Sequence, residues 1–596
     1  MPIPDVSSIE MRSRKWWSRR AALFVAVCLG AASAPVAALP EQRRAGSAQD
    51  ASARSAAAGL TTLRRTIVSE GEKDLGFGAG ERPVTRKLGW KDPGGAGQPL
   101  VGFKQLSDVH VIDEESPARV EWMDGCDTPF NAAYRVQEAM SLQVGDSMLR
   151  RLAKIRRGPA TGVDLSFVVS TGDNIDNNQL NELRWFISLL DGDRVDPNSG
   201  GAGYHGYTQE HFAPALPLDI LEMAQEPFDA VGTKVPWFAV LGNHDGLVQG
   251  NAPQNASFET VAEGARKAFI PIDGYDNCPD DPGDSTQLQQ LLENATATSS
   301  EEVPADVART FVDHEELVEE FFQSDGRPRG HGLARAPEDP MHDSRGGYYS
   351  FPMGGRVRGI AIDTISYDGV SDGHVPDPQF KWLRRELRRW STRYFAGGQA
   401  KRNRKGRDKL IVLFSHHSSD TLRNPGGDAE GQPFHCFRKS DQPECEAGEG
   451  LKNLLHRYPN VVAWVNGHEH NNAVRAFPAP GDRDPARGFW EINTAAHIDW
   501  PQQSRIVEIS WAPGRGGAAD TVFIHGTVVD HSAAPDPNAD SQSLVAYLSS
   551  VSRVEAHYDA CVRTGQADCA APGRRKDRNV KLVIKAPFDL GGRAPR

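Results

Sequence analysis

The sequence lacks an apolar run long enough to cross a membrane as a helix. The segment Ala21–Ala34 is apolar, but its 14 residues fall short of the about 20 that a bilayer-spanning helix needs. The mean hydropathy of the 596-residue chain is -0.50, which excludes a protein with several membrane spans. We therefore expect no transmembrane span in the mature protein.

The sequence also lacks an excess of positive charge. Its 67 lysines and arginines face 79 aspartates and glutamates, for a net charge of -12. Duplex binding draws its affinity from cations that neutralise phosphates, so we expect no specific nucleic-acid partner. A local exception is the run Arg384–Lys409, which contains 11 lysines or arginines. Such a run is either a solvated surface or a contact with a polyanion or the cell surface.

The first 38 residues have the pattern of a signal peptide. Basic residues precede the apolar segment Ala21–Ala34, and small residues near Ala38 offer a cleavage site. The sequence SRRAAL, Ser18–Leu23, matches a twin-arginine export signal, with an ordinary secretory signal as the alternative. We expect residues 39–60, which contain few large apolar side chains, to form a disordered linker. The mature protein is then extracytoplasmic, either secreted or associated with the cell wall.

Cysteine usage agrees with export. No CxxC pair occurs, so nothing supports a zinc ribbon or a thioredoxin-like site. Six of the seven cysteines lie after the apolar segment, and an even number in an exported chain predicts disulfides. The pairs Cys436–Cys445 and Cys561–Cys569 would close short loops, which leaves Cys126–Cys278 as the third pair. The alternative is a set of free buried thiols.

Five apolar runs each end in a cluster of Asp, Asn or His. The runs are 100–106, 165–170, 235–241, 410–414 and 461–465, and the clusters after them contain Asp108 and His110, Asp173, Asn243 to Asp245, His416 and His417, and His468 and His470. Runs that are apolar on both faces are typical of buried strands. Because ligands gather at the carboxyl ends of parallel strands, we expect the five clusters to meet at one site.

Helices and long insertions separate these runs. The segment Phe380–Trp390 has apolar residues at helical spacing, with arginines on the other faces. The segments 177–234 and 250–345 separate neighbouring motifs and are expected to be insertions. We divide the mature chain into a catalytic domain, residues 61–540, and a C-terminal extension, residues 541–596, that packs on it.

The polar clusters carry carboxylate, amide and imidazole donors but no thiolate. This donor set suits Mn, Fe, Zn or Co better than Ca or a sulfur site. Two such ions, divalent or trivalent, need a shared ligand, which a carboxylate can supply. Together they would bind a phosphoryl oxygen and provide metal-bound hydroxide at neutral pH for attack on phosphorus.

These motifs, in this order, resemble those of the calcineurin-like metallophosphoesterases. The matching motifs are Asp108-x-His110, Gly172-Asp173, Gly242-Asn243-His244-Asp245, Ser415-His416 and Gly467-His468-x-His470. The resemblance covers roughly residues 100–512 and implies an α/β fold, a four-layer α/β/β/α sandwich of two mixed sheets. The wide gaps and the segments Gly488–Trp490 and Pro501–Arg505 are similar to an exported, long-insert subgroup found in actinobacteria, many members of which have twin-arginine signals.

The resemblance also implies a role for each motif residue. Asp108, His110 and His470 would hold one metal ion, Asn243, His416 and His468 would hold the second, and Asp173 would bridge them. His244, oriented by Asp245, would contact the substrate phosphate and protonate the leaving oxygen. The chain is therefore expected to be an exported hydrolase of phosphate mono- or diesters, acting on a small molecule, a lipid headgroup or a wall polymer. The alternative is an exported binding or surface protein that keeps the fold without turnover.

Other polar residues near the motifs have open roles. His417 is the alternative to His416 as a ligand, and His497 either supports the ligands or is a structural histidine. Asp176 stands where purple acid phosphatases of the same superfamily have a metal-binding tyrosine, so no tyrosinate–iron colour is expected. Three residues either orient Asp173 or cap the next helix, and we expect mainly capping with some supporting role at the site: Asn174, Asp176 and Asn177. The insertion histidines that we do not expect to be ligands are His205, His211, His331 and His342.

Overall fold

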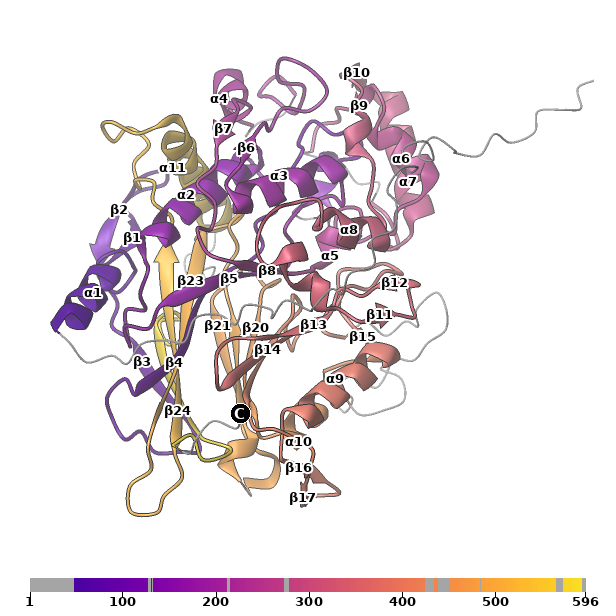
Figure 1. Ribbon diagram of the computed structural model, residues 1–596. Helices are drawn as coiled ribbons and strands as arrows, with labels where there is room; N and C mark the ends of the chain where they lie inside the picture. The colour runs from indigo at the N-terminus through magenta and orange to yellow at the C-terminus, as the bar shows by residue number, and fades with distance from the viewer. Residues whose placement is uncertain are drawn as a thin grey trace, which may run out of the picture. The chain divides into compact units, whose positions relative to one another are not determined.

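Two mixed β-sheets, packed face to face, form the centre of the computed structural model (Figure 1). The expected signal peptide, Cys445 and Cys569 lie outside the described residues. The structure describes residues 48–126, 130, 132–211, 215–272, 278–423, 434–437, 450–482, 484–563 and 572–591. All of these belong to one compact unit, residues 39–596.

The first sheet has seven strands in the order β3-β25-β24-β23-β4-β5-β8. In that order their bounds are Val84–Leu88, Val580–Lys585, Thr521–Asp530, Gln503–Ala512, Gln98–Leu106, Leu165–Thr171 and Trp237–Val240. The neighbours β4, β5 and β8 are parallel, whereas β23 is antiparallel to both β4 and β24. The strands predicted near residues 100, 165 and 235 are therefore confirmed as β4, β5 and β8.

The second sheet has six strands in the order β13-β14-β18-β20-β22-β21. In that order their bounds are Tyr349–Pro352, Val357–Ala361, Leu410–Phe414, Val461–Asn466, Phe489–Asn493 and Ala473–Phe477. The four central strands β14, β18, β20 and β22 are parallel, and the two edge strands are antiparallel to their neighbours. The remaining two predicted strands are confirmed as β18 and β20.

Apolar side chains from both sheets meet in one core. The ring of Phe103 on β4 packs edge-on against the ring of Phe414 on β18, with centroids 5.5 Å apart, and both side chains are fully buried. Every residue of β18 and β20 is buried, as expected for strands covered on both faces. Apolar burial of this extent, at about 25 cal/mol per Å², provides most of the driving force for packing the sheets together.

Amphipathic helices cover the outer faces, which completes the predicted α/β/β/α arrangement. The helices are α2 (Ser141–Lys154) and α3 (Leu180–Asp191) on the first sheet, and α9 (Asp377–Arg389) and α10 (Leu451–Arg457) on the second. Helix α9 shows how the sequence specifies this layer: proline at its second position favours a helix start. Its Phe380, Leu383 and Leu387 are buried against the second sheet, while its arginines lie on the other faces.

The two segments expected to be insertions relate differently to the core. Segment 177–234 begins with α3, whose Leu183, Phe186 and Leu190 are buried in the main core, so this part belongs to the outer helical layer. The first part of segment 250–345, up to Phe311, instead builds a separate small core with Trp122, Phe130 and Ala133 among others. Its later residues Val312, Leu317, Val318, Phe321 and Leu333 are buried in the main core. The elements of the two segments after α3 are β6 (Arg194–Val195), α4 (Leu218–Ala224), β7 (Phe228–Asp229), α6 (Ala256–Ala262), β9 (Arg266–Ala268), α7 (Ser285–Thr298), β10 (Ser300–Glu302), α8 (His314–Glu320), β11 (Glu338–Asp339) and β12 (Ser344–Arg345).

The second insertion is tied to the small core by a disulfide. Cys126 and Cys278 are bonded, with Cα atoms 5.8 Å apart, which confirms the third predicted pair. Cys436 and Cys561 are also disulfide-bonded. Their predicted partners lie outside the described residues, so those two pairings stay predictions.

Two further helices flank the sandwich. Part of the segment expected to be a disordered linker forms α1 (Ala48–Ala58), in which six of eleven residues are alanine, the strongest helix former. Near the other end, α11 (Leu544–His557) packs on α2, where the Ser549 hydroxyl donates to the carbonyl oxygen of Gln143 over 2.8 Å. Within the described part of the chain, no helix combines the length and apolar character needed to cross a membrane.

Candidate metal centre

The seven predicted ligands meet at one edge of the sandwich. Each follows the carboxyl end of a parallel strand, with β4, β5 and β8 contributing from the first sheet and β18 and β20 from the second. The residues are Asp108 and His110 after β4, Asp173 after β5, Asn243 after β8, His416 after β18, and His468 and His470 after β20. Parallel strands place their carboxyl ends at the same edge, so separate motifs converge.

Five of these seven residues have backbones in the left-handed region. The residues and their φ angles are Asp108 (51°), His110 (46°), Asp173 (47°), His468 (73°) and His470 (50°). Residues other than glycine adopt such angles rarely, at a cost of order 1–3 kcal/mol each. Strained backbone of this kind is often found where it positions functional groups. Here the strained residues are predicted metal ligands.

Two motif glycines are required by close approach. Gly172 has φ +91°, and a Cβ there would lie 2.6 Å from the His416 side chain. A Cβ on Gly467 would collide with the Ser107 hydroxyl and lie 2.5 Å from Asp108 Oδ2. Both glycines therefore let one ligand loop pack directly against another.

Asp173 lies between histidines of the two predicted metal positions. Its Oδ2 is 3.1 Å from Nε2 of His416 and 3.6 Å from Nε2 of His110. Burial by itself disfavours the charged carboxylate, but His416 and His244 hold the pKa of Asp173 well below its usual value. The side chain is thus a buried carboxylate at the place where a shared ligand is needed.

Two pairs of imidazole nitrogens lie on either side of Asp173. Nε2 of His110 is 3.3 Å from Nε2 of His470, and Nε2 of His416 is 3.1 Å from Nδ1 of His468. Two nitrogens bound to one zinc-like ion at about 2.0–2.1 Å in tetrahedral geometry lie about 3.3 Å apart. Each pair therefore has the spacing of two ligands on a single ion.

Two oxygen donors complete the sets. Oδ1 of Asp108 is 3.5 Å from Nε2 of His470 and accepts the backbone N–H of His468 over 2.9 Å. Oδ1 of Asn243 is buried and has no hydrogen-bond partner among the described residues, while its Nδ2 donates to the carbonyl oxygen of Gly250. An unsatisfied buried acceptor costs about 1–3 kcal/mol, and a bound cation would satisfy it. The residues present therefore fit two metal ions.

The hydrogen bonds of the two neighbouring histidines favour His416 over His417 as the metal ligand. His417 is fully buried; its Nδ1 is 2.8 Å from the Thr364 hydroxyl and its Nε2 is 2.8 Å from the carbonyl oxygen of Ser371. Both of its ring nitrogens are thus engaged. In His416, Nδ1 hydrogen-bonds the carbonyl oxygen of Thr171 and leaves Nε2 directed at Asp173.

His244 lies at the site, but Asp245 does not orient it. Both carboxylate oxygens of Asp245 accept hydrogen bonds from the backbone or side chains of the 172–175 loop and of Gly242. The ring of His244 is instead held through Nδ1, which is 2.6 Å from the carbonyl oxygen of Asp176. The orienting role expected of Asp245 is wrong. The Asp245 carboxylate instead accepts hydrogen bonds from four N–H groups, which belong to Gly242, Asn174 and Ile175.

Two carboxylates contact ring nitrogens of predicted ligand histidines. The sequence allows Asp176 a supporting role besides helix capping, but it does not single out Asp499. Nδ1 of His110 is 2.8 Å from Oδ1 of Asp176, and Nδ1 of His470 is 2.6 Å from Oδ2 of Asp499. Each carboxylate is in turn paired with a buried arginine, Arg119 at 2.6 Å from Asp176 and Arg135 at 3.0 Å from Asp499. Such partners fix the orientation of a ligand histidine.

The helix-capping roles expected beside Asp173 are wrong. Helix α3 begins without a side-chain cap. Asn174 instead binds Asp245, and the side-chain oxygen of Asn177 accepts the backbone N–H of Gln249, so both residues fasten loops of the site. His497 lies behind the ligands, where its backbone N–H donates to the carbonyl oxygen of Asp108 and its Nε2 contacts the Ser504 hydroxyl at 2.8 Å.

A cavity of about 150 Å³ opens onto the centre. Its lining includes Asp173, Asn243, His244, His468 and His470 from the motifs, and Arg135, Gln249, Asn251 and Ser371 as further polar residues. The volume suits a phosphoryl group and little more. A phosphoester could therefore place its phosphate beside the ligands while the rest of the molecule lies outside.

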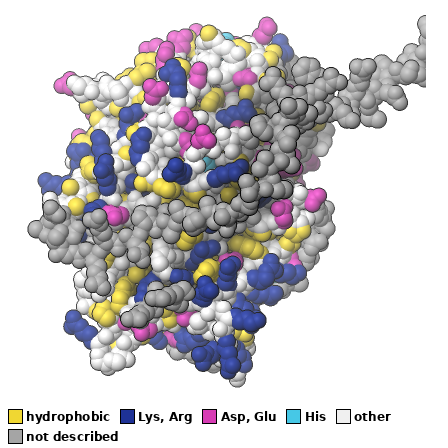
Figure 2. All heavy atoms as spheres, in the orientation of Figure 1, with side chains coloured by type: hydrophobic (Ala, Val, Ile, Leu, Met, Phe, Trp, Pro, Cys, Tyr) yellow, Lys and Arg dark blue, Asp and Glu magenta, His cyan; other side chains and the backbone are white. Residues whose placement is uncertain are grey.

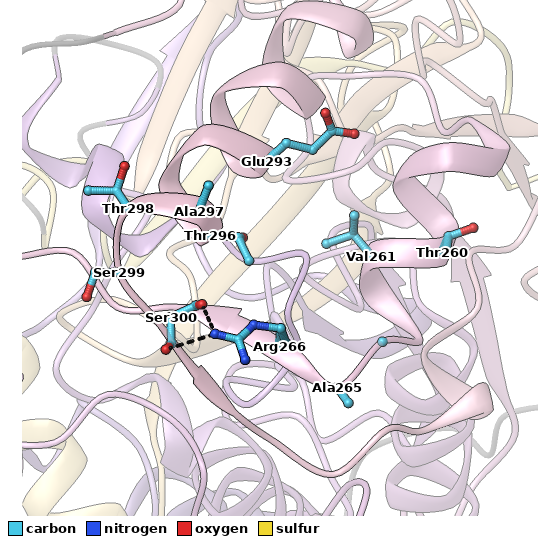
Figure 3. Close-up of a pocket in the computed structure, with 11 residues that line it drawn as sticks. Thr260, Val261, Ala265, Arg266, Glu293, Thr296, Ala297, Thr298, Ser299 and Ser300 are labelled. Atoms are coloured by element: carbon cyan, nitrogen blue, oxygen red, sulfur yellow. Dashed lines mark hydrogen bonds between the residues drawn. The ribbon is translucent and has the colours of Figure 1, made fainter.

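A larger cavity of about 710 Å³ lies in the second insertion, between α6, β9 and α7 (Figure 3). At one side of this cavity, Arg266 on β9 donates to the neighbouring Ser300 hydroxyl on β10 over 2.6 Å, and Glu293 is the other charged residue that lines it. None of the predicted site residues contributes to the lining. We therefore place the candidate functional site at the smaller cavity, where the donor groups converge.

Comparison with known proteins agrees with the motif assignment. A sequence model described as "Calcineurin-like phosphoesterase" matches residues 103–472, a span that contains all five motifs. No curated protein matches the chain. One matching solved structure, titled "Structure of PhoD", is 12% identical, covers 82% of this chain and 83% of that chain, and has a TM-score of 0.28.

Proposed function

The chain belongs to the calcineurin-like phosphoesterase family, and on this premise we propose that it is an exported enzyme that hydrolyses phosphate mono- or diesters. One observation carries the proposal. The buried carboxylate of Asp173 lies between two groups of nitrogen and oxygen donors, 3.1 Å from His416 and 3.6 Å from His110. A ligand shared by two metal ions would occupy such a position.

The donors divide into two sets around Asp173. Asp108, His110 and His470 would hold one ion, and Asn243, His416 and His468 would hold the other. The absence of thiolate from these sets favours Mn, Fe, Zn or Co. When bound, two such ions would neutralise phosphoryl oxygens and supply hydroxide at neutral pH for attack on phosphorus.

His244 is the candidate general acid. Its Nδ1 is engaged by the carbonyl oxygen of Asp176, so Nε2 is the nitrogen left to contact substrate. Its side chain is partly exposed, at 19%, and lines the cavity beside Asp173. We propose that His244 contacts the phosphate and protonates the leaving oxygen.

Polar residues at the rim of the cavity are placed to contact a substrate. Arg135, Gln249, Asn251 and Ser371 line it together with the ligand residues. These groups can hydrogen-bond phosphate oxygens, but they do not distinguish a monoester from a diester or a small molecule from a lipid headgroup or wall polymer.

A panel of phosphomonoesters and phosphodiesters, assayed on protein of known metal content, tests the proposal. Metal-loaded, folded protein that hydrolyses none of them would favour the non-catalytic alternative.

Export is proposed from the N-terminal segment. The twin-arginine pattern Ser18–Leu23 leads into the apolar segment Ala21–Ala34 and overlaps its first three residues, and the disulfide Cys126–Cys278 is compatible with an oxidising compartment. The twin-arginine route carries folded proteins, which suits one that takes up its metals in the cytoplasm. Residues 61–540 were expected to form the catalytic domain with residues 541–596 packed on it; because β25 lies inside the first sheet between β3 and β24, we propose instead that residues 541–596 are part of the same domain.

A basic surface supports an association with the cell surface. Lysines and arginines gather at the lower end of the view in Figure 2, over α9 and the hairpin of β16 (Arg393–Ala396) and β17 (Gln399–Arg402). The exposed members of this basic surface are Arg384, Arg385, Arg388, Arg389, Lys401, Arg402, Arg404, Lys405 and Arg407. It lies at the amino end of β18, whereas the metal ligands follow the carboxyl ends of the strands. The surface can therefore bind an anionic polymer without blocking the site.

Charge removal tests this association. The variant Arg402→Gln/Arg404→Gln/Lys405→Gln removes three exposed cations from the hairpin region and should lower binding to an anionic wall polymer, most clearly at low salt. Exchange of three exposed cations elsewhere, Arg184, Arg266 and Arg515, is the matched control. Equal binding by both variants and the wild type would count against the association.

A further inference from the structure

One arginine lies in the wall of the cavity that opens onto the predicted metal ligands. Arg135 lines this cavity together with Asp173, His244, His468 and His470. Among the described residues that line the cavity, Arg135 is the only lysine or arginine. Its guanidinium stays charged at any physiological pH and carries five N–H donors in a fixed plane. A side chain of this type is suited to bind a phosphate group.

The guanidinium of Arg135 is buried but only partly engaged. The residue is 7% exposed, and its Nε lies 3.0 Å from Oδ1 of Asp499. Neither Nη1 nor Nη2 has a hydrogen-bond partner among the described residues. Burying N–H donors in this way is unfavourable unless solvent or a ligand satisfies them. Arg135 therefore has donors left for a molecule in the cavity.

A structural role alone does not explain Arg135. As the counter-ion of Asp499 it uses one N–H of its five, and Nε2 of Gln137 lies 3.4 Å from the same carboxylate oxygen. The two terminal nitrogens take no part in this contact. Their position in the wall of the cavity is explained if they bind a ligand there.

Two amides that line the same cavity also have unused polar atoms. Nε2 of Gln249 and Oδ1 of Asn251 are buried without a hydrogen-bond partner among the described residues, and both residues are at most 6% exposed. Buried polar groups are normally paired, so several unpaired groups around one cavity indicate that it receives a polar molecule.

The backbone around Arg135 is held from two sides. Ala133 is buried in the small core that the second insertion builds, whereas Tyr134 and Val136 are buried in a further core beside it in the sequence. The backbone N–H of Arg135 donates to Oε2 of Glu138 over 3.0 Å. The guanidinium is thus placed at the cavity before a substrate arrives, which lowers the cost of binding.

The charge of Arg135 favours one class of ester. A phosphomonoester carries close to two negative charges at pH 7 and has three non-bridging oxygens, whereas a diester carries one charge and has two such oxygens. As hydrogen-bond donors, the polar residues at the rim leave the class of ester open. An additional cation with two unused nitrogens, however, attracts the dianion more strongly. The cavity volume of about 150 Å³ also leaves little room for a second ester group.

We propose that Arg135 binds phosphoryl oxygens of the substrate through Nη1 and Nη2 and makes the site prefer phosphomonoesters to phosphodiesters. This inference rests on the proposed function and narrows its substrate class. Nε of Arg135 keeps its contact with Asp499, the partner of His470, while the terminal nitrogens hold the phosphate.

Binding of inorganic phosphate tests Arg135 without turnover. The full chain, at saturating metal, is titrated with phosphate in a calorimeter, and bound metal per chain is measured on the same samples. Arg135→Gln should bind phosphate about 10–100-fold more weakly than the wild type, the range for lost hydrogen bonds to a charged group. Arg135→Lys keeps the charge without the planar fork and should bind with intermediate affinity. The control Arg184→Gln removes an exposed arginine paired with Glu320 and should bind like the wild type.

The ratio of two esters tests the preference. The ratio of kcat/KM for nitrophenyl phosphate to kcat/KM for bis(nitrophenyl) phosphate should fall about 10-fold in Arg135→Gln, because the monoester loses more than the diester. If Arg135 acted only through Asp499 and His470, saturating metal would restore phosphate binding. An unchanged ratio, or wild-type phosphate affinity at saturating metal, overturns the inference.

The outcomes separate this inference from the proposed function. Hydrolysis by the wild type with an unchanged ratio in Arg135→Gln overturns only the inference. If the wild type hydrolyses neither ester, the proposed function fails, and weaker phosphate binding by Arg135→Gln still supports Arg135 as the phosphate-binding residue. Circular dichroism shows whether the variants fold. If neither does, a crystal structure of the wild type with phosphate replaces them: hydrogen bonds from Nη1 or Nη2 to the phosphate support the inference, and their absence overturns it.

Discussion

Nδ1 of His244 lies 2.6 Å from the backbone carbonyl oxygen of Asp176. A carbonyl oxygen only accepts, so Nδ1 carries a proton and Nε2 is the nitrogen that faces a substrate. The side chain of the same Asp176 holds Nδ1 of the ligand His110 at 2.8 Å. One residue therefore orients both a predicted metal ligand and the candidate acid, which couples their positions.

Replacement of His244 separates proton transfer from metal binding. We expect His244→Ala to keep its metal and to lose rate by about 10²-fold or more, the scale of general acid catalysis. The loss should be smaller for esters with good leaving groups such as nitrophenol, which need no proton. His205→Ala, in the first insertion, is the control and should keep the wild-type rate. A His244→Ala variant that loses metal would instead make His244 a ligand.

Asp499 should raise the metal affinity of the site through its contact with His470. Its Oδ2 is 2.6 Å from Nδ1 of His470, and Arg135 holds its other oxygen. Loss of such a partner commonly lowers metal affinity by about 10–100-fold, so we expect Asp499→Asn to need correspondingly more metal for half-maximal activity. Metal titration of the rate measures this shift. An unchanged titration midpoint, with a lower rate at saturation, would mean that Asp499 acts on the substrate rather than on the ligand.

Much of the site is predictable because local pattern and topology act together. A run such as 165–170 is apolar on both faces and forms a buried strand, so Asp173 must emerge at its carboxyl end beside the other motifs. The partners of the ligands are harder to predict. Arg119 and Arg135 lie in irregular chain, where no periodicity shows that they reach Asp176 and Asp499. The role of Asp245 is hard to predict for the same reason, because the N–H groups that donate to its carboxylate come close to it only in the folded chain.

The disulfide Cys126–Cys278 should stabilise the second insertion. It joins residues 152 positions apart, and crosslinks of long loops typically contribute about 2–4 kcal/mol. We expect Cys126→Ser/Cys278→Ser to lower the free energy of unfolding by about this amount in a denaturant titration.

Peptide mapping without reduction should also recover Cys436–Cys445 and Cys561–Cys569. Free, alkylated thiols at these four positions would reject both pairings and weaken the case for export.

The central claim is that a metal centre bridged by Asp173 hydrolyses phosphoesters. Its most direct test is the hydrolysis rate of nitrophenyl phosphate and bis(nitrophenyl) phosphate by the full chain, before chelation, after chelation and after metal reloading, beside Asp173→Asn. The account predicts a rate that falls to background on chelation and returns on reloading for the wild type, and a background rate for folded Asp173→Asn with less bound metal. Unchanged hydrolysis after chelation, or wild-type rate and metal content in Asp173→Asn, would contradict it.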